Sequence, residues 1–70
     1  QWDHVVSDPT TGAGPERYAY LWKPSKVKIK GRAWLEPTLA DPIDREPYLA
    51  RFTVGNQDIL LVNFHAIPTS

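Results

Sequence analysis

The sequence predicts a mainly β fold of four to five strands in a mostly antiparallel arrangement, without a substantial helix. Three observations lead to this fold class. Apolar and polar residues alternate along most of the chain, a pattern typical of half-buried strands. Clusters of Gly, Pro and Thr separate the alternating stretches. No stretch shows the 3.6-residue repeat of apolar positions that indicates an amphipathic helix.

The first two expected strands lie on either side of a loop. Residues 2–8 form a short strand, and the stretch rich in Thr, Gly and Pro at 9–15 predicts a loop. Residues 16–22 follow as the second strand, which Pro24 ends. Successive side chains of a strand point to opposite faces, so three aromatic residues share one face of this strand: Tyr18, Tyr20 and Trp22.

Three further strands are expected. Residues 26–32 alternate lysines with β-branched apolar residues, which is typical of a strand with one face in solvent. Residues 35–44 contain two prolines and predict an irregular crossing. Residues 48–54 and 59–65 flank a segment with turn chemistry, Gly55 to Asp58, and together they predict a β-hairpin.

The last expected strand differs from the others because residues 59–62 are apolar at four successive positions. Such a run predicts a central strand covered on both faces by other layers. Leaving these side chains in water would forfeit about 1.5–3 kcal/mol each. We therefore expect an incomplete domain, either an excised piece or a chain that folds on a partner. Self-association, or packing on another chain, is expected through residues 59–64 or through the face formed by Tyr18, Tyr20 and Trp22.

The composition narrows the kinds of site that the chain can hold. Its 70 residues suffice for one small domain at most. The absence of cysteine excludes a disulfide framework and a Cys-based zinc site. His4 and His65 are too few for a His-based metal cage. No apolar run approaches the roughly 20 residues of a membrane-spanning helix, so no membrane partner is expected, and the compartment is left open.

The formal net charge of zero conceals a basic stretch. From Arg17 to Arg32 the chain carries six basic residues and no acidic one. A basic ribbon next to aromatic residues can bind single-stranded nucleic acid through phosphate contacts and base stacking. Lysines on an exposed strand also protect a sheet edge against aggregation, which gives a structural alternative. A small nucleic-acid-binding module is therefore one hypothesis for the function.

Three sequence blocks carry a likeness to a known family. The blocks "ERYAYLWKPSKV", "DREPYLARF" and "LLVNFHAIP" occur in this order along the chain. In order and spacing they resemble the deoxyribonuclease-I-like branch of the endonuclease/exonuclease/phosphatase superfamily, with bacterial members the most similar, and the resemblance covers residues 2–68. It implies an α/β four-layer sandwich, of which residues 1–70 would be a single partial domain from the centre.

The resemblance also implies a reaction and its residues. The family hydrolyses phosphodiesters or phosphomonoesters with the help of Mg²⁺ or another divalent cation. Glu16 matches a carboxylate that orients a catalytic histidine, and His65 matches that histidine. Arg45 matches an arginine that contacts the substrate phosphate, a role that suits a planar guanidinium. Judged without the resemblance, Arg45 is half of a local ion pair with Asp44 or Glu46.

No metal site is expected within the chain itself. The family's metal ligands come from segments before and after this region, and the alternation of strand side chains sends Asp3 and His4 to opposite faces. We therefore expect a fragment of a metal-dependent phosphoester hydrolase, nuclease-like and inactive alone, whose cation and substrate belong to the longer parent. The substrate is left open among DNA, RNA, lipid or inositol phosphates and small phosphoesters. The alternatives are the nucleic-acid-binding module above and a β-rich interaction or oligomerisation unit.

The hydrolase hypothesis makes one geometric prediction. Glu16 opens one expected strand and His65 closes another. If these strands run antiparallel and near each other, the start of one meets the end of the other. We therefore expect Glu16 and His65 within hydrogen-bond reach, with Arg45 at the same cleft. A carboxylate that accepts from one imidazole nitrogen leaves the other nitrogen free for a phosphate.

Overall fold

The computed structural model confirms a mainly β chain without a substantial helix. It describes residues 1–12, 14–42 and 45–65. None of the helices in these ranges is long and apolar enough to cross a membrane. The elements, in chain order, are β1 (Asp3–Val6), β2 (Ala19–Trp22), β3 (Val27–Leu35), the 3₁₀ turn η1 (Pro37–Leu39), β4 (Tyr48–Val54) and β5 (Gln57–Asn63).

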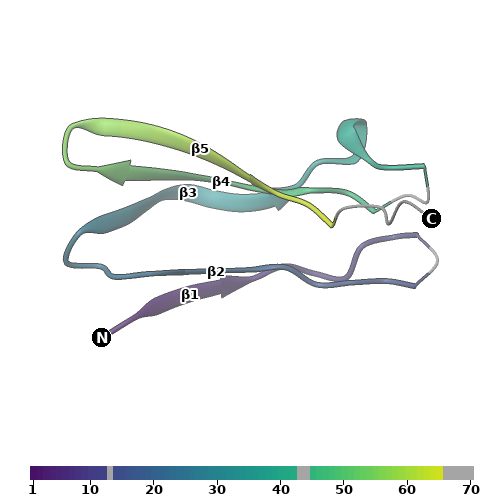
Figure 1. Cartoon of the computed structure of the whole chain (residues 1–70), viewed down its shortest axis with the longest axis horizontal. Helices are drawn as coiled ribbons and strands as arrows, with labels where there is room; N and C mark the ends of the chain where they lie inside the picture. The colour runs from purple at the N-terminus through teal and green to yellow at the C-terminus, as the bar shows by residue number, and fades with distance from the viewer. Residues whose placement is uncertain (13, 43–44, 66–70) are drawn as a thin grey trace.

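The strands form two antiparallel sheets that face each other as two layers (Figure 1). One sheet pairs β1 with β2, and the other has the order β3-β4-β5. Each pair in both sheets is antiparallel, as the sequence predicts. The four-layer α/β sandwich implied by the resemblance stays a prediction, because the described residues supply two sheet layers and no helical layer.

The predicted hairpin is present between β4 and β5. Val54 pairs with Gln57, so the turn consists of Gly55 and Asn56. Gly55 has φ 59°, the left-handed region that glycine enters without a Cβ clash. A glycine-asparagine pair with positive φ at its first position matches the right-handed twist of the flanking strands. The turn therefore fixes the register of the whole β4–β5 pair.

A bulge interrupts β3 at a second glycine. The register of β3 against β4 shifts between Lys30 and Trp34, and Gly31 adopts φ 76° within this gap. A bulge bends a strand and redirects the side chains that follow it. Lys30 faces the outer side, where it contacts Asp58, whereas Arg32 lines a cavity that borders β1 on the inner side.

The core lies between the two sheets. Trp22 from β2 packs edge-on against Phe52 from β4 with ring centroids 5.2 Å apart, and Tyr20 packs against the same ring at 5.6 Å. The Tyr20 hydroxyl donates to the backbone carbonyls of Tyr48 at 2.6 Å and Leu61 at 3.2 Å. These bonds satisfy a polar group at the layer interface, which would otherwise be costly to bury. β2 is thereby fixed over β4.

Within the described residues the last strand lacks the cover on both faces that its apolar run predicts. β5 is an edge strand that pairs with β4 alone. Ile59, Leu60, Leu61 and Val62 are 38%, 49%, 43% and 48% exposed. The apolar run correctly indicated a strand. Among the described residues, the second layer contacts β5 at Leu61 and Asn63 and leaves most of the apolar run uncovered. The run therefore remains in contact with solvent.

Candidate functional site

Glu16 is held by a narrow loop that continues the β1–β2 pair. The Thr10 backbone N–H donates to the Glu16 carbonyl at 2.8 Å, and the Glu16 N–H donates to the Thr10 hydroxyl at 3.0 Å. Closer to the strands, the Tyr18 N–H donates to Ser7 Oγ at 2.9 Å, and the Ser7 N–H donates to the Tyr18 carbonyl at 2.9 Å. These reciprocal bonds fix the backbone at Glu16 although its side chain lies near the surface.

Glu46 ties this loop to the other sheet. Its carboxylate accepts from the Thr11 N–H at 2.9 Å, and the residue is only 6% exposed. That hydrogen bond lowers the pKa of the Glu46 carboxyl below its ordinary value of 4.5. Glu46 precedes β4 by one residue, Pro47. The loop that carries Glu16 is thus attached to the segment that carries Arg45.

The lowered pKa of Glu46 predicts a loss of stability in acid. The stabilising effect is fully present above the ordinary pKa of 4.5 and is lost as the pH falls through the lowered folded-state pKa. We expect Glu46→Gln to reduce the change in unfolding free energy between about pH 6 and pH 2. Chemical denaturation of both proteins across this range measures the change, and an identical pH dependence in the two would refute this role for Glu46.

Arg45 is oriented by Asp41, a residue that the sequence analysis missed. The Arg45 N–H donates to Asp41 Oδ1 at 2.9 Å, and the Asp41 N–H donates to the Arg45 carbonyl at 3.3 Å. Arg45 Nε lies 3.8 Å from Asp41 Oδ2. The expected local partner Glu46 is used by the loop instead, and Asp44 lies outside the described residues. An Asp-Pro pair four residues before the arginine is a turn signal that could have indicated this contact.

The structure brings the three predicted site residues together. Glu16 Oε1 lies 3.5 Å from His65 Nδ1 and 3.8 Å from Arg45 Nη1. Arg45 Nη1 also contacts His65 Nδ1 directly. The three side chains come from the β1–β2 loop, the segment before β4 and the segment after β5. We call this set the Glu16–Arg45–His65 cluster; its geometry matches the expected arrangement, while the roles of its members stay predictions.

Tyr18 lies beside this cluster. Tyr18 is 8% exposed, and burial raises the pKa of its hydroxyl. The charges of Asp41 and Glu16 raise this pKa further, whereas the charge of Arg45 lowers it. The His65 backbone amide is close enough to act in the opposite direction on this pKa. That contact lacks the geometry of a full hydrogen bond, and the hydroxyl has no hydrogen-bond partner among the described residues.

A small cavity borders the cluster. Its volume is about 180 Å³, and both Arg45 and His65 line it. The Arg45 side chain is 11% exposed, so its guanidinium is nearly enclosed, whereas His65 is 43% exposed. The remaining walls include one further acid and four apolar or ring side chains: Leu39, Asp41, Pro47, Val62 and Phe64.

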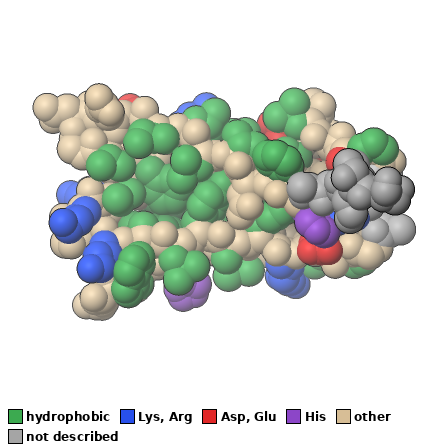
Figure 2. Space-filling model, in the orientation of Figure 1, with side chains coloured by type: hydrophobic (Ala, Val, Ile, Leu, Met, Phe, Trp, Pro, Cys, Tyr) green, Lys and Arg blue, Asp and Glu red, His purple; other side chains and the backbone are tan. Residues whose placement is uncertain are grey.

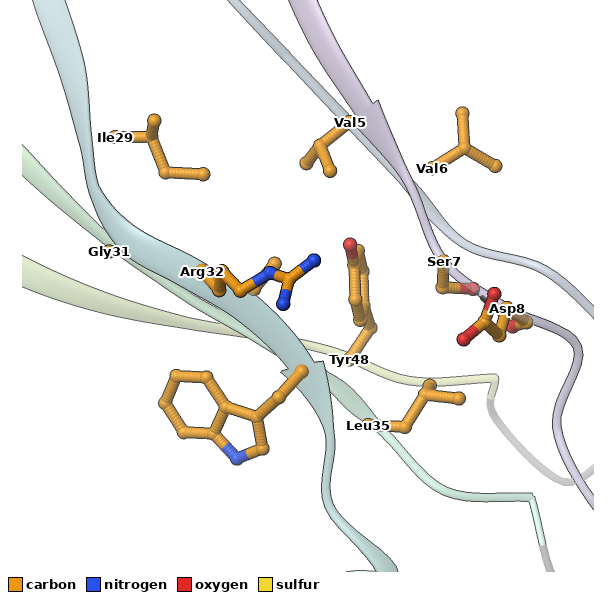
Figure 3. A pocket seen from close by; sticks show the side chains of 11 residues that line it. Val5, Val6, Ser7, Asp8, Ile29, Gly31, Arg32, Leu35 and Tyr48 are labelled. Atoms are coloured by element: carbon orange, nitrogen blue, oxygen red, sulfur yellow. Dashed lines mark hydrogen bonds between the residues drawn. The ribbon is translucent and has the colours of Figure 1, made fainter.

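A larger cavity of about 660 Å³ lies elsewhere, between β1 and β3 (Figure 3). Its lining includes Val5, Asp8, Arg32 and Tyr48 but no member of the Glu16–Arg45–His65 cluster. Figure 3 shows the Arg32 side chain directed into this space. We take the smaller cavity as the candidate site, because Arg45 and His65 line it.

The described residues do not fit a divalent cation. No group of three or more His, Cys, Asp or Glu side chains that could hold a metal ion occurs within residues 1–12, 14–42 and 45–65. At the cluster, the Arg45 guanidinium lies 3.8 Å from the nearest carboxylate oxygens of both Glu16 and Asp41. The guanidinium therefore occupies the place beside these oxygens that a bound metal cation would need.

Three of the six basic residues of the stretch contact other parts of the chain. Lys30 is paired with Asp58 at 2.6 Å, and Lys23 lies over the Trp2 ring at 5.4 Å. Arg17 donates to the Ser7 carbonyl at 3.0 Å. The aromatic face expected to stack on bases is turned into the core, where Tyr18 and Trp22 are 8% and 7% exposed. This burial leaves Tyr18 and Trp22 little surface on which bases could stack.

Comparison with known proteins gives one informative relative. The chain is 39% identical over 74 aligned residues to the endonuclease/exonuclease/phosphatase family domain-containing protein 1 of Bos taurus. The alignment covers 91% of this chain and 13% of that protein. No family model matches the chain, and no solved structure matches it. The similarity supports the endonuclease/exonuclease/phosphatase superfamily for this segment, while the deoxyribonuclease-I-like branch and the bacterial likeness stay predictions.

Proposed function

We propose that the chain is part of a metal-dependent phosphoester hydrolase, nuclease-like and inactive alone, and that the Glu16–Arg45–His65 cluster is its share of the active site. The observation that carries this proposal is the meeting of the three side chains from separate segments. The name of the bovine relative joins endonucleases, exonucleases and phosphatases, which supports phosphoester hydrolysis as the reaction class. The chain spans 13% of that relative, and the rest of the catalytic machinery belongs to the parent.

Arg45 binds the substrate phosphate in this proposal. A guanidinium offers a rigid fork of N–H donors that matches two phosphoryl oxygens. Asp41 fixes the backbone of Arg45, and the near-enclosure of the side chain reduces the entropy that binding would cost. Because Arg45 Nη1 contacts His65 Nδ1 and Nε is buried, a phosphate would bind at the Nη groups and replace the contact with His65.

In this proposal His65 transfers the proton of the reaction, and Glu16 orients the His65 ring. With its proton on Nε2, the neutral imidazole accepts at Nδ1 from Arg45 Nη1. The imidazolium instead donates from Nδ1 to Glu16 Oε1, which lies 3.5 Å away. A phosphate that accepts hydrogen bonds from the Arg45 N–H groups would end their contact with Nδ1. His65 could then donate from Nδ1 to Glu16. Nε2–H then faces the substrate as a donor to a phosphoryl oxygen, and Glu16 keeps the ring oriented.

The Mg²⁺-type ion of the proposed reaction would polarise the phosphoryl group and stabilise the leaving oxygen. Its ligands would come from the longer parent, since the described residues do not supply them. The roles of Glu16, Arg45 and His65 given above therefore concern binding, orientation and proton transfer only.

Phosphate binding by the 70-residue chain tests this proposal. We expect inorganic phosphate to shift the NMR signals of the His65 ring and the Arg45 guanidinium in a saturable manner. Arg45→Ala should weaken this binding at least tenfold, because hydrogen bonds to charged groups contribute about 1.5–3 kcal/mol and about 1.4 kcal/mol is a factor of ten. Arg17→Ala is the control, since Arg17 donates to Ser7 outside the cluster. The proposal fails if phosphate causes no saturable shift, or shifts that Arg45→Ala leaves unchanged.

A further inference from the structure

The buried polar side chains of this structure gather around the loop that joins β1 to β2. Among the described residues, Ser7, Thr10 and Glu46 are the polar side chains that are almost fully buried, at 2%, 3% and 6% exposure. Burying a polar group is costly unless it is hydrogen-bonded, and each of these three accepts from a backbone N–H of this loop or of its base. The polar interior therefore holds the loop that carries Glu16.

Glu46 is the member of this set that comes from the segment before β4. Its carboxylate accepts from the Thr11 N–H at 2.9 Å, across 35 positions of sequence. The neighbouring Thr10 exchanges two hydrogen bonds with Glu16, at 2.8 and 3.0 Å. Two adjacent threonines thus link the Glu46 carboxylate to the Glu16 backbone. Because Glu46 directly follows Arg45 in the chain, the same carboxylate links Glu16 to Arg45.

Glu16 and Arg45 are restrained to different degrees. Arg45 exchanges two hydrogen bonds with Asp41 through its backbone, and its side chain is 11% exposed. The Glu16 side chain is 44% exposed, so its position depends on the backbone of the loop. Figure 1 shows this loop and the segment before β4 at the same end of the molecule, and Figure 2 shows acidic, basic and histidine side chains beside one another at that end. Loss of the Glu46 bond should therefore displace Glu16 more than Arg45.

We propose that Glu46 is a positioning residue of the Glu16–Arg45–His65 cluster: its carboxylate holds the β1–β2 loop at the distance from which Glu16 can orient His65. The catalytic consequence of this inference rests on the proposed function. Glu46 does not line the cavity beside Arg45 and His65, so it acts through Glu16 and not on the substrate. Its partner is a backbone N–H, so it determines where the loop lies.

Small movements of the loop matter because the Glu16–His65 contact is already long. Glu16 Oε1 lies 3.5 Å from His65 Nδ1, whereas hydrogen bonds of this kind usually measure about 2.7–3.2 Å. A further displacement of about 1 Å would end the contact, and misplacements of this size can cost about 10²-fold in rate. The loss should appear in kcat rather than in KM, because Asp41 still holds Arg45, the proposed phosphate contact.

Amide hydrogen exchange of the 70-residue chain tests this restraint without any substrate. In Glu46→Leu the Thr11 N–H loses its acceptor. We expect the protection of the Thr11 and Glu16 amides to fall at least about tenfold, because exchange reports local opening and a charge-assisted hydrogen bond is among the stronger ones. The amides of the central strand β4 should change much less. Glu46→Gln keeps an oxygen acceptor and should keep most of the protection.

Glu36→Leu is the matched control for the exchange experiment. It removes another hydrogen-bonded carboxylate, which accepts from Trp34 and Thr38 outside the β1–β2 loop, and it should leave Thr11 and Glu16 protected. The proposal is overturned if Glu46→Leu leaves the protection of these two amides unchanged. It is also overturned if protection falls equally in the loop and in β4, since that result is a general loss of stability.

Turnover of the longer protein tests the consequence for the reaction. We expect Glu46→Leu to lower kcat by about 10- to 10²-fold with little change in KM, and Glu46→Gln to retain most of the activity. In a Glu16→Gln background, Glu46→Leu should cost little more. An equal loss of kcat in both backgrounds would overturn the proposal, because Glu46 would then act independently of Glu16. Failure of the proposed function would appear differently, as no phosphoester hydrolysis by the unmodified longer protein, with the exchange result at Thr11 unaffected.

Discussion

His65→Ala is expected to lower phosphodiester turnover by about 10²- to 10⁴-fold, the usual contribution of a positioned acid–base group. The measurement requires a longer chain that contains this segment together with the metal ligands. Substrate affinity should fall much less, because the proposed phosphate contact of Arg45 is unchanged in this variant. The expectation follows from the position of His65, which borders the cavity with one nitrogen facing Glu16.

His4→Ala is the control for that experiment. His4 is an exposed residue of β1 and pairs with Leu21 in the smaller sheet, away from the residues that line the Arg45–His65 cavity. It should leave turnover unchanged. Wild-type turnover in His65→Ala, or an equal loss of turnover in both variants, would show that His65 takes no part in the reaction.

Phe52→Ala is expected to destabilise the fold by about 3–5 kcal/mol, the usual cost of truncating a buried phenylalanine. Phe52 is 3% exposed and contacts the rings of both Tyr20 and Trp22. These two contacts join β2 to β4, so the variant should separate the layers as well as leave a cavity. Folded domains are stable by only about 5–15 kcal/mol, and a chain of this size has little reserve.

Urea denaturation followed by tryptophan fluorescence measures this loss. Leu21→Ala provides the comparison, because Leu21 lies between Tyr20 and Trp22 in β2 but is 67% exposed. That variant should cost no more than about 0.5 kcal/mol, as surface substitutions usually do. Equal denaturation midpoints for the two variants would contradict the placement of the core at Phe52.

The local structure was predictable because local chemistry determines it. Alternation and the apolar run from Ile59 identified the strands, the segment from Gly55 to Asp58 identified a turn, and the prolines of the crossing excluded a long strand there. Each of these signals acts within a few residues. The turn is shorter than expected, because it consists of Gly55 and Asn56 and β5 begins at Gln57 rather than at Ile59.

Features that depend on distant contacts were harder to predict. The apolar run from Ile59 to Val62 indicates that the strand needs cover, but it does not indicate whether the chain supplies that cover, and β5 lies at an edge. Asp41 became recognisable only when the turn brought its carboxylate back to Arg45. The same holds for Glu46, whose partner Thr11 lies in the other sheet's loop.

The prediction of the candidate site depended on the family resemblance more than on any local sequence pattern. A glutamate after a proline and a histidine after an apolar strand are common features, and neither predicts the other. Their meeting requires β2 to lie over β4 and β5, an arrangement held by Tyr20 and by the packing of Trp22 on Phe52. Sequence blocks matched as a set carried that long-range information.

A double-mutant cycle between Glu16 and His65 tests the central claim most directly. Turnover is measured for the longer protein, for Glu16→Gln, for His65→Ala and for the double variant. If Glu16 acts by orienting His65, the double variant should lose little more turnover than His65→Ala alone, because residues that act as a unit are not additive. A loss equal to the product of the two single losses would contradict the account, since Glu16 and His65 would then act independently.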